Sequence, residues 1–144
     1  MNFFHNEIND QDVFDFNISS IPEDKYWGMH LIIDMAKCDE IKISDKNHII
    51  QFSKELVSEI KMNSYGEPIV EYFAKDDPNA CGFSLVQLIE TSNICAHFAE
   101  KSKSVYLDIF SCKTFSPSSA IEIAKKYFKP QTIKPKLIFR GLNS

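Results

Sequence analysis

The segment from residue 82 to residue 112 reads GFSLVQLIETSNICAHFAEKSKSVYLDIFSC, and it decides the fold. Three short apolar runs follow one another here, at about residues 83–89, 94–98 and 105–110, and each favours a strand. The polar run at 100–104 predicts a hairpin between the last two. Strands this close in sequence pair antiparallel, because a parallel pair needs a crossover of a dozen or more residues. The segment therefore predicts the centre of an antiparallel sheet.

The residues before this segment predict one strand, one helix and another strand. Residues 26–34 are rich in β-forming residues and indicate a first core strand. A helix is expected from Ser44 or Asp45, because apolar residues recur after it at three- and four-residue intervals. The run 63–66 ends that helix, and 69–73 predicts a second strand.

The residues after the segment predict a second helix and a last strand. Ser116 followed by Pro117 is typical of a helix start, and an apolar stripe continues to Phe128. Residues 133–139 then indicate a strand. This order of elements predicts an α+β fold: a two-layer α/β sandwich, with an antiparallel sheet and two helices on one face.

Length and composition narrow the class of protein. A chain of 144 residues is long enough for one domain, and we expect it over 25–144. Residues 1–24 are acidic and rich in Asn, and we expect them to form an N-terminal arm. A net charge of −4 and a pI near 5.5 argue against nucleic-acid or anionic-membrane partners. No apolar run approaches the roughly 18 residues of a membrane span. The first 24 residues lack the Lys or Arg of a secretory signal, so we expect a cytoplasmic protein.

The four cysteines predict free thiols. They stand at positions 38, 81, 95 and 112, form no C-x-x-C pair and match no zinc-binding spacing. We therefore expect no metal site.

Four residues of the central segment carry the chemistry: Ser84, Ser92, His97 and Cys112. On adjacent strands, two hydroxyls, an imidazole and a thiol could converge on one point. If the turn before Ser92 is strained, its hydroxyl can attack the Thr91 carbonyl, and elimination and hydrolysis then leave a pyruvoyl group. His97 can carry or accept the proton near neutral pH. Taken singly, each residue is more often an ordinary packed or hydrogen-bonded side chain.

A pyruvoyl group derived from Ser92 would act as the cofactor of a decarboxylase. Its carbonyl forms a Schiff base with a substrate amine and draws electrons as carbon dioxide leaves. Cys112 is the candidate donor that protonates the product, because a thiol is mostly protonated at neutral pH. Ser84 would be a hydrogen-bonding helper on the neighbouring strand.

From residue 26 to about residue 140 the chain resembles the bacterial and archaeal class of S-adenosylmethionine decarboxylase, a pyruvoyl enzyme of polyamine synthesis. The segments that carry the resemblance are 28–34 (GMHLIID), 37–39 (KCD), 108–112 (DIFSC) and 140–141 (RG). The family has Thr where this chain has Ser111. Its four working residues fall on the quartet Ser84, Ser92, His97 and Cys112 with the same spacing.

The resemblance implies a role for each member of the quartet. It makes Thr91–Ser92 the self-cleavage site, His97 an assistant in cleavage, Cys112 the proton donor, and Ser84 a helper in processing or binding. It also implies a homodimer that binds a small amino-acid-type substrate near the subunit interface.

The departures from the family lie beside the cleavage serine and at a position that binds the nucleoside. Thr91 replaces a Glu, Asn93 replaces a His, and Ala99 stands where the family has a Trp that stacks on adenine. An adenine site would then need an aromatic ring from Phe98, Tyr72 or Phe73.

Three functions remain open from the sequence. The leading one is decarboxylation of S-adenosylmethionine. The second is the same chemistry on arginine or ornithine, whose basic side chain could be received by Asp76 and Asp77 or by Glu100, although the pair at 76–77 is more simply a solvated turn. The third is a non-catalytic homologue that regulates an active partner, which predicts no self-cleavage.

Overall fold

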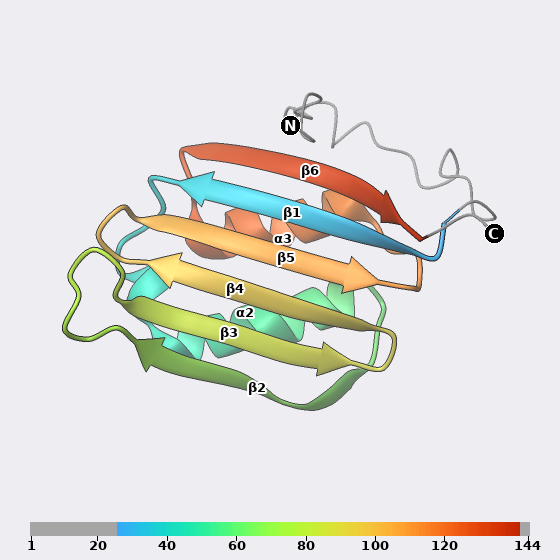
Figure 1. The fold of residues 1–144 in the computed structure, drawn as a ribbon, viewed down its shortest axis with the longest axis horizontal. Helices are drawn as coiled ribbons and strands as arrows, with labels where there is room; N and C mark the ends of the chain where they lie inside the picture. Colours follow the sequence, from blue (N-terminus) through green and yellow to red (C-terminus); the bar gives the residue numbers. More distant parts are fainter. Residues whose placement is uncertain (1–25, 142–144) are drawn as a thin grey trace.

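The computed structural model describes residues 26–141. One antiparallel sheet of six strands, in the order β2-β3-β4-β5-β1-β6, forms one layer. Figure 1 shows both long helices, α2 and α3, on one face of this sheet. The elements are β1 (Gly28–Ala36), the 3₁₀ helix η2 (Lys42–Ser44), α2 (Lys46–Glu59), β2 (Ser64–Phe73), β3 (Gly82–Ile89), β4 (Ser92–Ala99), β5 (Ser104–Ser111), α3 (Pro117–Phe128) and β6 (Thr132–Arg140).

The predicted fold class is confirmed, and one boundary differs from expectation. The second strand begins at Ser64 rather than at residue 69, because the ladder continues across a register shift between Tyr65 and Ile69. Gly66 makes this irregularity possible, since its φ of 73° is one that glycine adopts at little cost. The first strand lies inside the sheet, between β5 and β6. The predicted arm over 1–24 lies outside the described residues.

Local signals start both helices where the sequence indicated. Asp45 caps α2 by accepting a hydrogen bond from the backbone N–H of His48 at 3.2 Å. Ser116 caps α3 in the same way, through the N–H of Ser119, and Pro117 takes the first helical position. These caps fix where each helix meets the sheet.

The core lies between the helices and one face of the sheet. Alternate residues of β1 face the helices and are at most 1% exposed: Met29, Leu31, Ile33 and Met35. Three rings from three elements fill the centre. Phe128 of α3 lies 4.7 Å from Phe52 of α2 and 5.1 Å from Phe98 of β4, measured between ring centroids.

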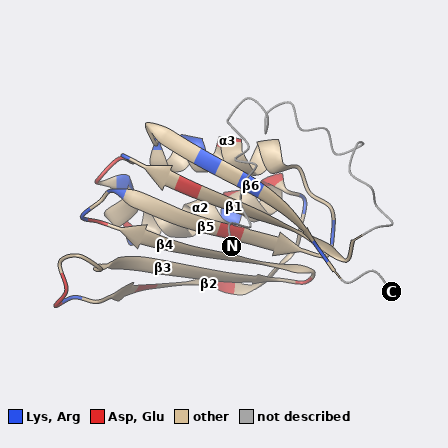
Figure 2. Cartoon of the chain, turned by 45° about the horizontal axis from the view of Figure 1, so that its top comes forward, with Lys and Arg blue, Asp and Glu red and all other residues tan. Residues whose placement is uncertain are grey.

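The opposite face of the sheet carries no helix in the described part of the chain. Strands β3 and β4 have no charged residue along their length (Figure 2). Large apolar side chains that are exposed on β2, β3 and β5 point to this side of the sheet, and we call them the open-face patch: Tyr65, Ile69, Phe73, Val86, Leu88 and Tyr106. Such an exposed apolar patch is typical of an interaction surface.

Ser53 offers a test of the packing between α2 and the sheet. Its side chain is fully buried, and its hydroxyl has no hydrogen-bond partner within the described residues. An unsatisfied buried hydroxyl is destabilising, so Ser53→Ala should raise the free energy of unfolding by about 1 kcal/mol beyond the gain in helix propensity. Urea denaturation measures this. Ser58→Ala, on an exposed position of the same helix, has the same propensity gain and serves as the matched control. A loss of stability in Ser53→Ala alone would contradict the interpretation.

Candidate active site

The hairpin between β3 and β4 presents the peptide bond that the sequence predicts to be cleaved. Ile89 pairs with Ser92, and the two residues between them, Glu90 and Thr91, form the turn. On the other side of β4, Ser92 pairs with Ser111, the last residue of β5. The end of β5 therefore lies directly beside the Thr91–Ser92 bond.

Cys112 contacts the carbonyl group of Thr91 through two donors. Its backbone N–H donates to the Thr91 oxygen at 3.1 Å, and its thiol lies 3.4 Å from the same oxygen. Two donors aimed at one carbonyl oxygen polarise the carbonyl and stabilise the negative charge that a nucleophile creates there. The predicted proximity of Cys112 and Ser92 is thus present within one chain.

The Ser92 hydroxyl turns toward the helix side of the sheet. Its Oγ lies 2.6 Å from Oγ of Ser111, 3.0 Å from the sulfur of Met62 and 3.1 Å from Oγ1 of Thr91. Ser111 and Met62 were not predicted from the sequence. Their positions depend on strand register and on the turn after α2.

Ser84 and His97 form a second pair at the far end of the same strands. They pair across β3 and β4, and Ser84 Oγ shares a hydrogen bond of 2.9 Å with His97 Nδ1. His97 stands five positions after Ser92 along β4, which in an extended strand is about 17 Å. Within one chain the quartet therefore forms two separate pairs, and it does not converge on one point.

A cavity of about 500 Å³ surrounds the Ser84–His97 pair on the open face. Phe73 and Tyr106 line it from either side, and Tyr106 lies directly opposite His97 in the β4–β5 ladder. Tyr106 is an aromatic residue that the sequence reasoning missed. Counting residues in both directions from the predicted turn at 100–103 pairs Tyr106 with His97, and paired residues point to the same face of a sheet. The sequence could therefore have placed Tyr106 beside His97.

The three predicted stacking residues lie in different surroundings. Phe73 is exposed at the cavity, as a ligand-stacking ring requires. Phe98 is 1% exposed and packs against Phe128, so the expectation that its ring stacks on a ligand is wrong: the core already holds it. Tyr72 donates its hydroxyl hydrogen bond to Glu100 at 2.9 Å and packs edge-on against Phe83. Hydrogen bonds to Cys81 and Glu100 raise the pKa of Tyr72.

Two of the three acidic residues that could receive a basic substrate, Asp77 and Glu100, are engaged locally. Asp77 accepts a hydrogen bond from the N–H of Asn79 at 2.9 Å, as turn-forming Asp residues do. Glu100 accepts the hydroxyl of Tyr72. In the described part of the chain, no group of three or more His, Cys, Asp or Glu residues could hold a metal ion.

Comparisons with known proteins match the part of the chain that contains this site. The sequence model of the family described as S-adenosylmethionine decarboxylase matches residues 29–141. This chain belongs to that family. A relative from Clostridium botulinum strain Hall, named S-adenosylmethionine decarboxylase proenzyme, is 29% identical over 118 residues, which cover 81% of this chain and 97% of the relative. A protein of the same name from Pyrococcus horikoshii is 29% identical over 116 residues, covering 80% and 79%.

The fold agrees with a solved member of the family. The crystal structure of the adenosylmethionine decarboxylase from Aquifex aeolicus matches with a TM-score of 0.71 and 19% identity, over 83% of this chain and 95% of that one. The predicted family and its enzyme class, a carboxy-lyase, are thus confirmed. The roles of individual site residues stay predictions.

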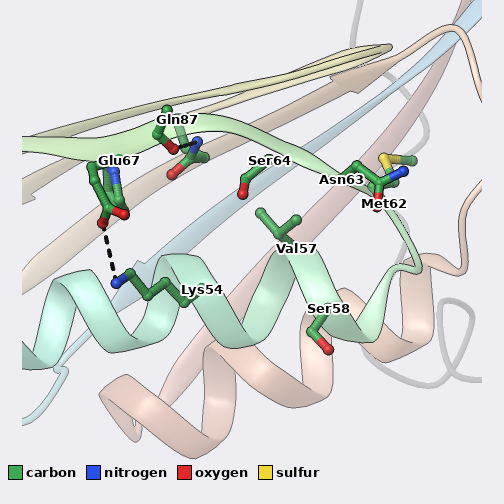
Figure 3. Close-up of a pocket in the computed structure, with 10 residues that line it drawn as sticks. Lys54, Val57, Ser58, Met62, Asn63, Ser64, Glu67 and Gln87 are labelled. Atoms are coloured by element: carbon green, nitrogen blue, oxygen red, sulfur yellow. Dashed lines mark hydrogen bonds and ion pairs between the residues drawn. The ribbon is translucent and has the colours of Figure 1, made fainter.

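A second cavity, of about 400 Å³, lies between α2 and β2 on the helix side. Figure 3 shows the ion pair of Lys54 and Glu67 across it, with a nitrogen–oxygen distance of 3.1 Å. The amide of Gln87 donates to the carbonyl of Gly66 and supports the irregular part of β2. Met62 lines the cavity and also contacts Ser92, so the cavity lies behind the predicted cleavage site.

No helix of the described residues is long and apolar enough to cross a membrane.

The thiols of Cys112 and Cys38 should differ sharply in reactivity. Cys112 is exposed, whereas Cys38 is 5% exposed and its burial raises the pKa of the thiol to about 11. The thiolate is the reactive form, and the raised pKa keeps Cys38 almost wholly protonated at pH 8, so Cys38 reacts faster only as the pH approaches 11. Iodoacetamide at pH 8, followed by peptide mass spectrometry, should modify Cys112 first and Cys38 last. Equal rates at both positions would contradict this placement.

Proposed function

We propose that this chain is a pyruvoyl-dependent S-adenosylmethionine decarboxylase of polyamine biosynthesis that forms its own cofactor by cleavage at Thr91–Ser92. One observation carries the proposal: two donors of Cys112 bind the Thr91 carbonyl oxygen, and the Ser92 hydroxyl lies next to the same peptide bond. A polarised carbonyl beside a nucleophile is what an N-to-O acyl shift needs.

The proposed cleavage conserves every atom. Oγ of Ser92 bonds to the carbonyl carbon of Thr91, the C–N bond between the two residues breaks, and the hydroxyl proton ends on the freed nitrogen. Removal of the α-proton of Ser92 then expels the Thr91 carboxylate and leaves dehydroalanine. Water replaces the nitrogen, ammonia leaves, and a pyruvoyl group begins the chain that runs from position 92 to 144.

The surrounding residues fit such a group. The pyruvoyl group supplies an electron-withdrawing carbonyl that accepts the amine of the substrate and takes up electrons as carbon dioxide leaves. Cys112 contacts the Thr91 carbonyl beside position 92, and in this proposal its thiol donates the proton to the product. Ser84 orients the His97 imidazole through the hydrogen bond to Nδ1. These roles agree with those that the family resemblance implies.

We further propose that two copies of the chain complete one site. Ser84 and His97 lie about 17 Å along β4 from Ser92, which is too far for contact within one protomer. The open-face patch gives a second copy an apolar surface to cover. A two-fold axis that lies between two such faces, perpendicular to β4, places the His97 end of one protomer over the Ser92 end of the other, so each His97 approaches the Thr91–Ser92 peptide bond of the other copy from the open face. The homodimer is then required for chemistry as well as for burial.

The site favours S-adenosylmethionine over arginine or ornithine as the substrate. Asp77 and Glu100 are already hydrogen-bonded within the chain, whereas Phe73 and Tyr106 offer rings beside the Ser84–His97 pair. Aromatic rings suit an adenine better than a guanidinium or amine that needs a carboxylate. A small amino-acid-type substrate and a second copy are the proposed partners, without nucleic acid or membrane, and the proposed location is the cytoplasm.

Self-cleavage is the first test of the proposed function. The intact mass of the purified full-length chain should resolve into residues 1–91 and residues 92–144, with the second fragment blocked by pyruvoyl and lighter by the lost ammonia. Ser92→Ala removes the nucleophile and should stay whole. If the wild-type chain also stays whole, alone and with added cell extract, the regulatory homologue becomes the better hypothesis.

Complementation between two inactive variants tests the shared site. His97→Ala and Cys112→Ala should each fail to cleave efficiently when expressed alone. When they are expressed together with different tags, the His97→Ala chain has its own Ser92 and Cys112 and receives His97 from its partner, because each site uses residues of both copies. Mass spectrometry should then find the His97→Ala chain cleaved in mixed dimers.

A co-expressed pair of two His97→Ala chains is the matched control, since no copy then supplies the imidazole. Mixed dimers that form, as judged by tandem affinity purification, but leave the His97→Ala chain uncut would refute the shared site.

A further inference from the structure

Ser111 faces the predicted nucleophile and is completely buried. It ends β5, pairs with Ser92 in the antiparallel ladder, and has 0% of its surface exposed. The distance between the two Oγ atoms, 2.6 Å, is the shortest of the three contacts that the Ser92 hydroxyl makes. A buried hydroxyl at this distance from a reacting atom limits where that atom can go.

The oxygen of Ser111 is itself held in place. It accepts a hydrogen bond from the backbone N–H of Lys113 at 2.9 Å, which closes the turn at the end of β5. The side chain of Lys113 donates to the carbonyl of Lys61 at 3.2 Å, and this ties the same turn to the segment that carries Met62. Ser111 is therefore a fixed acceptor, and the Ser92 hydroxyl adapts to it.

The self-cleavage reaction depends on one orientation of Ser92. A serine side chain has three staggered rotamers, and an attack on the preceding carbonyl requires the oxygen to point at the Thr91 carbon. The donor hydrogen must at the same time point away, so that a lone pair faces the carbonyl. A hydrogen bond from Ser92 to Ser111 directs that hydrogen away and removes the other rotamers.

We propose that Ser111 is a positioning residue for self-cleavage, which orients the Ser92 hydroxyl by accepting its hydrogen bond. This inference rests on the proposed function and adds a residue to it. Ser111 keeps its own proton throughout: the Ser92 Oγ bonds to the Thr91 carbon, the Thr91–Ser92 C–N bond breaks, and the hydroxyl proton ends on the freed nitrogen. The Thr that the family has at this position carries the same hydroxyl.

The test follows self-cleavage of the full-length chain over time after cell-free synthesis. Ser111→Ala should slow cleavage about tenfold or more, because the Ser92 hydroxyl loses its shortest hydrogen bond and its orientation. Ser111→Cys, of similar size but a weak acceptor, should be slow as well. Ser111→Thr should restore the rate to within about threefold of wild type, which a purely space-filling role does not predict.

Ser104→Ala is the matched control, since Ser104 begins the same strand, is also buried and donates only to the carbonyl of Ser102. It should cleave at the wild-type rate, and melting temperatures should show that all variants fold. Wild-type rates in folded Ser111→Ala and Ser111→Cys would overturn the inference while leaving the proposed function in place. An uncut wild-type chain would overturn both.

Discussion

The pairing of Ser92 with Ser111 in the β4–β5 ladder is the interaction on which the candidate site depends. It places the end of β5 beside the β3–β4 turn, and the next residue, Cys112, then reaches the Thr91 carbonyl with its backbone N–H. A slip of one residue would reverse the face of every side chain on β5. It would expose the buried residues Val105, Leu107 and Ile109 and remove Ser111 from Ser92. The apolar core thus enforces the register that the chemistry needs.

The same geometry separates the two halves of the quartet. Once Ile89 pairs with Ser92 across a two-residue turn, an antiparallel ladder must pair Ser84 with His97. The hydrogen bond between Ser84 and His97 and their distance from Ser92 therefore have one cause. No side-chain rotation closes a gap of about 17 Å, so the separation is a property of the hairpin itself. In the proposed dimer, a second copy of the chain supplies the missing imidazole.

Much of the fold and part of the site could be predicted from the sequence. The apolar runs and helix caps located both long helices and all six strands in residues 26–141, because those signals are local, whereas the short 3₁₀ helix η2 was not predicted. The place of β1 between β5 and β6 depends on which strand edges meet, which no local pattern encodes. The onset of β2 was missed because Gly66 and Pro68 lie at its irregularity and resemble a loop.

The errors at the site arose from counting positions without assigning them to faces. His97 and Phe98 are neighbours, so strand alternation sends them to opposite sides of the sheet. With His97 on the open face, Phe98 had to enter the core, and this was deducible from the sequence. Ser111 and Met62 were not, because their contacts with Ser92 come from a ladder and from a turn whose positions only the folded chain fixes.

The two faces of the sheet carry different groups that the proposed reaction requires. On the helix side, Ser111 and Met62 hold the Ser92 hydroxyl within a rigid core, and Cys112 at the strand end binds the carbonyl that this hydroxyl attacks. The imidazole lies on the open face, and in the proposed dimer assembly brings it to the Thr91–Ser92 bond of the other copy. In this proposal the Ser92 hydroxyl is oriented as soon as one chain folds, whereas proton transfer by His97 waits for the dimer. On this proposal an unassembled chain keeps its serine, and maturation of the enzyme reports that assembly has occurred.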